Sequence, residues 1–292
     1  MKIKIRMKDK VFDTSIIFLT AFAALMCLLP MLYILAISFS SNFAIASRQV
    51  FIWPVEFTIE SYQAVFGDKS MMNSMIFTIW LTVVCTVLSM IMTTLAAYPL
   101  TKKQLKGRNF FLVMIVITMY FGGGMIPDYI LIKTLNFIDK PWALILPGCL
   151  SAFNMIILKT FFSNLPESLE ESAFLDGASH LTILIRIVIP LSTPVLATLS
   201  LFYAVGRWNG FQDALFYINS QHLYPLQLKL YQLVFNNQMA ELAQLEGTTA
   251  QTVAPESLKG AAVMFVTIPI IMVYPWLQRY FISGIMIGAI KG

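Results

Sequence analysis

An uncharged stretch fills residues 70–101 and reads SMMNSMIFTIWLTVVCTVLSMIMTTLAAYPLT. It exceeds the roughly 20 residues that a helix needs to cross the hydrocarbon core of a bilayer. In the whole 292-residue chain 58% of residues are hydrophobic and 12% are charged, and that charged fraction is about half the value for soluble domains. Lipid must therefore be the solvent for most of this chain, which excludes disordered and ordinary cytosolic proteins.

Five further apolar runs accompany this one. They cover residues 14–39, 109–127, 141–162, 184–206 and 260–283. The first run is long and has no small-residue cleavage site, so we interpret it as a retained span and not as a cleaved signal. We predict an all-α membrane protein with six transmembrane helices, in which a short segment, residues 1–13, precedes one membrane domain, residues 14–292.

Basic residues indicate the orientation of the chain. They concentrate in the first ten residues (Lys2, Lys4, Arg6, Lys8 and Lys10) and in the loop after the second span (Lys102, Lys103, Lys106 and Arg108). Because cytoplasmic loops carry the excess of Lys and Arg, both termini are expected in the cytoplasm. Loops 101–108 and 163–183 then face inward, and loops 40–69, 128–140 and 207–258 face outward. The net charge of +5 therefore marks cytoplasmic loops and not nucleic-acid binding.

The inner loop at residues 163–183 predicts a short helix, a turn and a second helix. Asn164 followed by Glu167 is typical of a capping box, Gly177 of a helix stop, and Ser179 of a second N-cap. Two alternatives are open for this hairpin, rest on lipid headgroups or docking to a protein. Its acidic first turn would be repelled by anionic lipid, which favours the protein partner.

The same loop carries a resemblance to a known family. The sequence Glu171-Ser172-Ala173-Phe174-Leu175-Asp176-Gly177, then nine residues, then Ile187-Val188-Ile189-Pro190, resembles the EAA motif of ABC-importer permeases. That motif reads Glu-Ala-Ala, three residues, Gly, nine residues, Ile-x-Leu-Pro, so Ser172 and Ile189 depart from it while the spacing is intact.

Three other segments agree with this resemblance. Residues 207–211 (RWNGF) resemble the Trp-Asn-x-Phe signature of carbohydrate-importer permeases, and residues 278–292 resemble the C-terminal signature of that group. Residues 121–127 (FGGGMIP), with Pro147 and Gly148 downstream, resemble the subgroup that handles complex oligo- and polysaccharides.

The resemblance implies a type I ABC-importer permease fold with a cytoplasmic EAA coupling helix in the coupling loop, residues 163–189. The chain would be the permease subunit of an ATP-driven, binding-protein-dependent importer of oligosaccharides or polysaccharide fragments, and would form half of the translocation pore in the bacterial inner membrane. The implied partners are a second homologous permease subunit, an ATP-binding cassette ATPase dimer, an extracytoplasmic solute-binding protein, the carbohydrate and membrane lipid. The long outer loop, residues 207–258, would meet the binding protein or form a lid on the permease.

The residues expected to couple to the ATPase follow from the motif. They are Glu171, Ala173, Asp176, Gly177, Ala178, Leu181, Leu184 and Pro190. Leu184 has two open interpretations, an apolar contact to the ATPase and packing within the helix bundle.

Polar side chains within the spans, or at their outer ends, are candidates for the substrate path. They are Asn73, Tyr120, Asp128, Tyr129, Asn154, Tyr203, Trp208 and Asn209. Intramembrane Asn also joins helices to one another, and Trp at this level also anchors a span at the lipid interface. Both alternatives stay open.

No catalytic, metal or cofactor site is expected in this chain. It has no GxxxxGK[ST] loop, so ATP and Mg would be used by the partner ATPase. The predicted spans contain no Asp or Glu, which disfavours an ion-coupled carrier. The two histidines, His180 and His222, lie in loops, which disfavours an intramembrane enzyme. An importer of a non-sugar solute is the nearer alternative.

Overall fold

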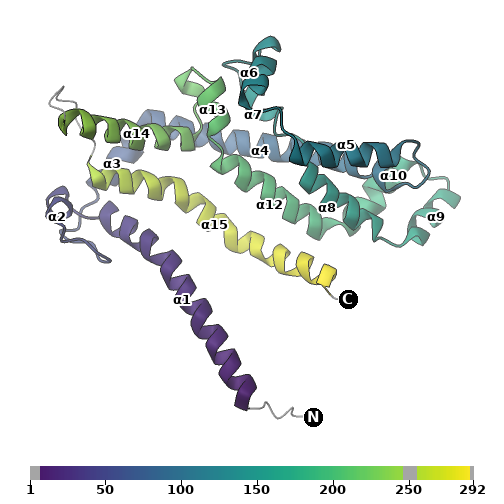
Figure 1. Ribbon diagram of the computed structural model, residues 1–292, viewed down its shortest axis with the longest axis horizontal. Coiled ribbons are helices and arrows are strands. Elements are labelled where there is room, and N and C mark those ends of the chain that lie inside the picture. Colours follow the sequence, from purple (N-terminus) through teal and green to yellow (C-terminus); the bar gives the residue numbers. More distant parts are fainter. Residues whose placement is uncertain (1–6, 246–254, 290–292) are drawn as a thin grey trace. The chain divides into compact units, whose positions relative to one another are not determined.

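The computed structural model describes residues 7–245 and 255–289, and every regular element in these ranges is a helix (Figure 1). The all-α prediction is thereby confirmed for the described part of the chain. Three helices are long and apolar enough to cross a membrane: Phe12–Ser38, Lys69–Thr101 and Glu256–Val273. Two sharply bent helix pairs raise this number to five if each pair is one span. The count of six spans stays a prediction.

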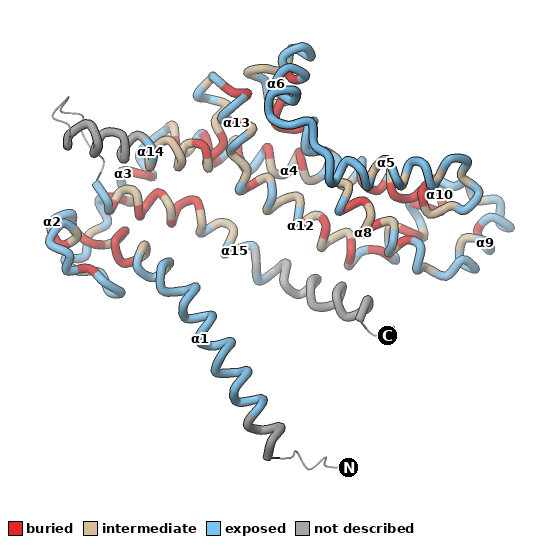
Figure 2. The backbone as a smooth tube through the Cα atoms, viewed as in Figure 1, coloured by how far each residue is buried: buried red, intermediate tan, exposed pale blue. Residues whose placement is uncertain are grey.

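The chain divides into two compact units, Met1–Lys69 with Leu230–Ile268, and Ser70–Lys229 with Pro269–Gly292. The first unit contains α1 (Met7–Ser38), α2 (Asn42–Ala46) and α3 (Glu60–Gly67). Residues 12–30 of α1 are all exposed (Figure 2). An apolar helix with so much exposed surface requires lipid or another protein around it.

Small side chains bring α1 close to the start of α15 (Glu256–Ala289) in the first unit. A Cβ atom on Gly260 would lie 3.2 Å from Cγ2 of Ile37 and 3.3 Å from the carbonyl oxygen of Ile34. The Ser61 hydroxyl donates to Oγ of Ser257 at 2.8 Å, and the Ser257 hydroxyl donates to Oδ1 of Asn42 at 2.6 Å. Within the first unit, these contacts hold the end of α1 against the start of α15 and join that start to α2 and α3.

The second unit contains, in whole or in part, the helices that follow α3. They are α4 (Lys69–Ala97), the 3-10 helix η1 (Pro99–Thr101), α5 (Arg108–Tyr120), α6 (Met125–Thr134), α7 (Trp142–Ile145), α8 (Ala152–Ser163), α9 (Glu167–Leu175), α10 (His180–Ile183), the π-helix η2 (Leu184–Val188), α11 (Ile189–Leu191), α12 (Thr193–Asn209), α13 (Gln212–Tyr217), the 3-10 helix η3 (Gln221–Leu223) and α14 (Leu226–Leu245). Helices α14 and α15 contribute residues to both units.

The third apolar run is broken by its glycines. Helix α5 ends at Tyr120, and α6 leaves it at an angle of 114°. Gly124 occupies the left-handed region with φ +87°, where glycine carries no Cβ penalty. Helix α6 continues to Thr134, so the first part of the predicted outer loop is helical, and the side of the membrane on which this loop lies stays a prediction.

The fourth and fifth apolar runs are also interrupted. The predicted single helix at 141–162 was wrong: α7 and α8 are separated by residues 146–151, where Pro147 lacks the N–H that a helix needs. The helix that starts at His180 continues into the fifth run, which bends by 84° between Leu191 and Thr193. The short π-helix Leu184–Val188 precedes this bend. Such irregularities within helices are often found at functional sites.

One buried core joins the helices at one end of the second unit. It includes Ala97 at the end of α4, Leu100 of η1, Leu158 on α8 and Leu199 on α12. Ala173 of α9 belongs to the same core, which appears in red around α8 and α10 in Figure 2. The loop between the fourth and fifth runs is therefore packed on the bundle, and is not a free connection.

The long segment 207–258 is largely helical. It contains α13, η3 and α14, while its residues 246–254 lie outside the described residues. Asp139 fastens this segment to the loop after α6. Its Oδ1 atom accepts the N–H groups of Asn219 at 3.0 Å and Ser220 at 2.8 Å, and its Oδ2 atom accepts the Ser220 hydroxyl at 2.6 Å. These hydrogen bonds lower the pKa of the Asp139 carboxyl.

We expect acid to weaken the hydrogen bonds that the Asp139 carboxylate accepts from Asn219 and Ser220. Since the folded-state pKa of Asp139 is lowered, the stabilisation is complete above the ordinary carboxyl value of about 3.9 and is lost as the pH falls through the lower, folded value. Amide exchange at Asn219 and Ser220, corrected for intrinsic rates, should accelerate below about pH 4. In Asp139→Ala it should be fast at pH 6 already. Equal amide protection in the natural protein and in Asp139→Ala at pH 6 would show that Asp139 does not hold this segment.

Candidate functional site

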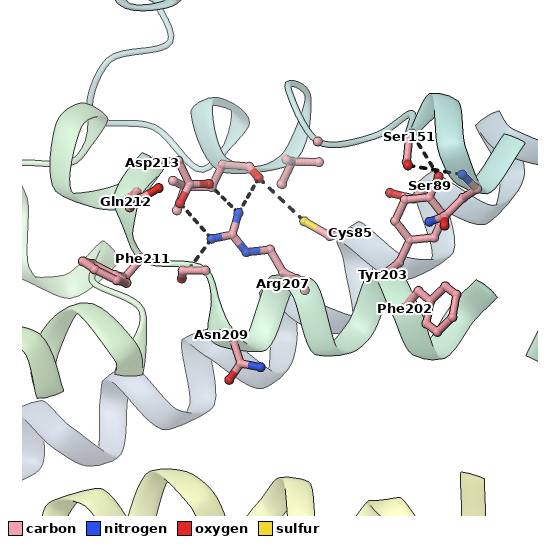
Figure 3. A pocket seen from close by; sticks show the side chains of 16 residues that line it. Cys85, Ser89, Ser151, Phe202, Tyr203, Arg207, Asn209, Phe211, Gln212 and Asp213 are labelled. Carbon is pink, nitrogen blue, oxygen red and sulfur yellow. Dashed lines mark hydrogen bonds and ion pairs between the residues drawn. The ribbon is translucent and has the colours of Figure 1, made fainter. Parts of the chain in front are cut away.

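A cavity of about 560 Å³ opens in the second unit where the fourth apolar run is broken (Figure 3). We call it the α12 cavity. Its lining residues come from α4, from the segment 144–154, from α12 and from the turn into α13. Gly148 and Ser151 of the break belong to this lining. Non-helical backbone at membrane depth is tolerated where it lines such a cavity, so the break and the cavity explain each other.

Arg207 and Asp213 form an ion pair in the cavity wall. Nη1 of Arg207 donates to Oδ2 of Asp213 at 2.5 Å, and Nη2 donates to Oδ1 at 3.0 Å. Nη1 also donates to the carbonyl oxygen of Leu144 at 3.0 Å, and Nη2 to that of Gly210 at 3.2 Å. The guanidinium thus joins the end of α7, the end of α12 and the start of α13. A Cβ atom on Gly210 would lie 2.9 Å from Nη2, so glycine leaves room for this group.

Tyr203 joins three helices around the same cavity. Its hydroxyl shares a hydrogen bond of 2.7 Å with Oγ1 of Thr93 on α4 and accepts the backbone N–H of Ser151 at 3.1 Å. Oγ of Ser151 in turn accepts the N–H of Asn154 at 3.3 Å and caps α8. Tyr203 therefore positions the start of α8.

The structure brings together three of the residues expected on the substrate path, Asn154, Tyr203 and Asn209. The other five lie outside the cavity lining: Asn73, Tyr120, Asp128, Tyr129 and Trp208. Trp208 is only 7% exposed in the chain, and Tyr129 stacks on Tyr217 with ring centroids 6.2 Å apart.

Sequence reasoning missed five polar lining residues. They are Ser89, Ser151, Arg207, Gln212 and Asp213. The predicted fifth span ended at 206, immediately before Arg207. A signal was nevertheless present, because an arginine at the end of an apolar run needs a counter-charge if it is buried, and an aspartate follows six residues later.

A second candidate site is the elbow of residues 166–184, which we call the α9 elbow. Helix α9 begins after Pro166, which is its N-cap and makes no side-chain hydrogen bond, so the expected capping by Asn164 was wrong. The expected stop is confirmed: Gly177 has φ +81°. Its N–H donates to the carbonyl oxygen of Phe174 at 3.0 Å, and the N–H of Ala178 donates to the carbonyl oxygen of Ala173 at 2.9 Å. These two bonds are a Schellman motif.

The second helix of the elbow starts as the sequence indicates. Oγ of Ser179 accepts the N–H of Thr182, which confirms Ser179 as the N-cap of α10. Leu184 is 4% exposed and lies in the core, as its bundle-packing interpretation has it. Leu175 is 89% exposed and Leu181 is 59% exposed. Glu171 and Asp176 are exposed as well, and Pro190 is exposed further along the fifth run.

Two ion pairs hold the α9 elbow on the loop that follows α4. Glu170 pairs with Lys102, and the side chains of both are about one-fifth exposed, at 20% and 21%. Oε1 of Glu167 lies 2.8 Å from Nζ of Lys103, a pair that is largely exposed. The hydrogen bond and the charge of Lys103 lower the pKa of Glu167. A second cavity of about 830 Å³ lies between this loop and α9.

Several helices long and apolar enough to cross a membrane, which break around a cavity lined in part by polar side chains, are typical of a polytopic membrane protein of the transport class. Residues 107–287 match the profile of the family described as "Binding-protein-dependent transport system inner membrane component". The chain belongs to this family, as its EAA-like sequence predicted.

Relatives of known name cover nearly the whole chain. Protein LplC of Bacillus subtilis is 44% identical over 97% of this chain and 96% of its own length. The polygalacturonan/rhamnogalacturonan transport system permease protein YtcP of Bacillus subtilis is 38% identical over 98% of this chain and 100% of its own. A crystal structure of a bacterial ABC transporter involved in the import of the acidic polysaccharide alginate contains a chain that is 33% identical to this one, with a TM-score of 0.85. The match covers 94% of this chain and 98% of that chain.

The Arg207–Asp213 pair generates a stability prediction. Asp213→Ala leaves the mostly buried guanidinium without its counter-charge, and such a change costs about 3–5 kcal/mol. Arg207→Met combined with Asp213→Ala removes both charges and should recover most of that loss. Thermal unfolding of the purified protein in nanodiscs measures both variants. A double variant no more stable than Asp213→Ala alone would contradict this account.

Proposed function

We propose that this chain is the permease subunit of an ATP-driven, binding-protein-dependent importer of oligosaccharides or polysaccharide fragments. The observation that carries the proposal is the α9 elbow. It exposes Leu175 and Leu181, and it continues directly into the bent fifth run, whose last helix lines the α12 cavity. A group that pushes on the elbow therefore acts on the cavity wall through one continuous segment.

The proposed topology has six crossings. They are α1, α4, α5 with α6, α7 with α8, α10 to α12, and α15. The elbow and the basic loop 101–108 lie at one end of the second unit, joined by ion pairs, which supports a common cytoplasmic side for them. Both termini would lie on that side, and residues 14–292 would form one permease domain.

In this proposal the elbow docks into a cleft of a cytoplasmic ATPase, which binds ATP and Mg. Glu171 and Asp176 offer exposed carboxylates and Leu181 an apolar contact, whereas Ala173 and Leu184 transmit the push to the buried core. Gly177 and Ala178 fix the turn, and Pro190 belongs to the segment that precedes the bend. Because interfaces and packed cores have discrete arrangements, such a push favours one of two states of the pore.

The proposed substrate class rests on the cavity and on the relatives. The lining offers hydroxyl and amide groups together with the rings of Phe202 and Phe211, a combination suited to sugar hydroxyls and sugar ring faces. The relative named for polygalacturonan and rhamnogalacturonan transport supports the same class. An extracytoplasmic binding protein would deliver the saccharide near the segment 207–258, and a second homologous permease would form the other half of the pore.

The elbow generates a test. Proline at 177 cannot take φ +81° and lacks the N–H that bonds to Phe174. Gly177→Pro should weaken assembly with the ATPase about 100-fold, which corresponds to roughly 3 kcal/mol. Gly177→Asn is the matched control, since Asn tolerates the left-handed region, and it should retain most binding. Co-purification of the ATPase is the measurement, with protease accessibility to verify insertion. Normal recovery of the ATPase with Gly177→Pro would refute the docking role.

The partner permease is tested by reconstitution. Vesicles that hold this chain, the ATPase and the binding protein should take up no saccharide, because half of the pore wall is missing. Addition of the second, non-identical permease should restore ATP-dependent uptake. Full uptake without it would show that this chain forms a complete pore with copies of itself.

A further inference from the structure

The second cavity, of about 830 Å³, lies between the loop that follows α4 and helix α9, and we call it the elbow cavity. Its lining residues come from the segment 98–108, from the last turns of α8 and from α9 with the residues that flank it. All of these segments belong to the second unit. The elbow cavity is separate from the α12 cavity, with which it shares no lining residue.

The charges around the elbow cavity are unevenly distributed. Among the described residues that line it, the carboxylates all belong to α9, whereas the Lys and Arg side chains come from the other segments. The carboxylates are those of Glu167, Glu170 and Glu171, and the basic side chains are Lys102, Lys103, Arg108 and Lys159. Ion pairs join Glu170 to Lys102 and Glu167 to Lys103. Arg108 and Lys159 are left without a paired carboxylate, and Glu171 is exposed on α9.

Lys159 is the basic group that the protein leaves unsatisfied. It lies on the apolar helix α8 and is half-buried, and within the described part of the chain no hydrogen bond or ion pair engages its ammonium group. Arg108 begins α5 and is also half-buried. Its Nε atom donates to the carbonyl oxygen of Leu100 at 2.8 Å, which holds the guanidinium in place. Charges partly removed from water favour a counter-ion, and Arg and Lys are the residues that bind phosphate.

The elbow cavity lies where apolar helices end. The span Lys69–Thr101 ends at Thr101, which lines the cavity, and the bent pair α5 with α6 begins at Arg108. The ends of membrane-spanning helices lie at the level of the lipid headgroups. Phe111 follows Arg108 on the same face of α5 and is 51% exposed. An apolar helix surface thus continues from the basic side of the cavity, as the acyl chains of a phospholipid continue from its phosphate.

We propose that the elbow cavity binds the phosphate group of an anionic phospholipid, such as phosphatidylglycerol, through Lys159 and Arg108. Basic pockets between transmembrane helices on the cytoplasmic side are suited to such headgroups. The acidic first turn of α9 does not oppose this binding, because Glu167 and Glu170 are paired with lysines. The carboxylate of Glu171 is exposed, so water and salt screen it.

This site goes beyond the proposed import of saccharides and does not depend on it, since it uses neither a saccharide nor the ATPase. A free organic phosphate shares the chemistry of the headgroup. The exposed apolar face of α5 beside Arg108 favours the lipid, because a free phosphate has no acyl chain to cover that face.

The test uses the full chain in nanodiscs that contain phosphatidylcholine and phosphatidylglycerol in equal amounts. After release from the discs, native mass spectrometry measures which lipid stays bound. The natural protein should prefer phosphatidylglycerol by at least about 5-fold, and Lys159→Gln should weaken its retention about 5-fold. Lys159→Arg keeps the charge and should retain the lipid. Because no described side chain bonds to Lys159, Lys159→Gln should unfold at the same temperature as the natural protein in discs of phosphatidylcholine alone.

The matched control is Lys106→Gln. Lys106 belongs to the same basic loop and is exposed, but it does not line the elbow cavity. Its substitution removes an equal charge and should change the retention of phosphatidylglycerol by less than about 2-fold. Equal retention by the natural protein and Lys159→Gln, or equal losses in Lys159→Gln and Lys106→Gln, would overturn the site.

A competition experiment distinguishes the lipid from a free phosphate. Glycerol 3-phosphate carries the phosphate without acyl chains, and dihexanoylphosphatidylglycerol carries the headgroup with short ones. The first should displace bound phosphatidylglycerol at least about 10-fold less effectively than the second. Equal displacement by the two probes would overturn the assignment to a lipid. None of these outcomes bears on the import of saccharides, which the reconstituted uptake described above tests by itself.

Discussion

The second unit is organised by a single requirement, that backbone groups removed from water must find partners. Helices satisfy it wherever they are continuous, so each break exposes a few N–H and C=O groups. Side chains from other helices take them up. Arg207 bonds to the carbonyl oxygens of Leu144 and Gly210, Tyr203 accepts the N–H of Ser151, and Thr78 accepts that of Leu226 at 2.7 Å. The helix breaks and the polar residues around them therefore depend on each other.

The buried core and α12 connect the elbow to the α12 cavity. Ala173 of the elbow and Leu199 of α12 belong to one buried core, and α12 carries both Tyr203 and Arg207. In the proposed function, a displacement of the elbow would be transmitted to α12 through this close-packed core. The bend between Leu191 and Thr193 lies on this route. The route thus joins a surface suited to a partner with a cavity suited to a ligand.

Sequence reasoning predicted what depends on composition and local spacing. The apolar runs, the elbow with its stop at Gly177 and the cap at Ser179 follow from periodicity, backbone freedom and hydrogen bonding over a few residues. Hydropathy could not predict the breaks in the fourth and fifth runs, because it averages across Pro147 and Ser192. It also could not predict the cavity, because Arg207 meets Leu144 and Tyr203 meets Thr93 only after folding.

The two ion pairs of the α9 elbow differ in how they respond to the surrounding solution. Glu167 and Lys103 are about three-quarters exposed, at 74% and 77%, so dissolved salt screens their attraction. Glu170 and Lys102 are mostly buried, and Lys102 also lies over the ring of Tyr98, 4.3 Å from its centroid. Rising ionic strength therefore loosens the first turn of α9 while the middle of the helix stays attached. The elbow thus has one contact that dissolved salt screens strongly and one that it screens much less.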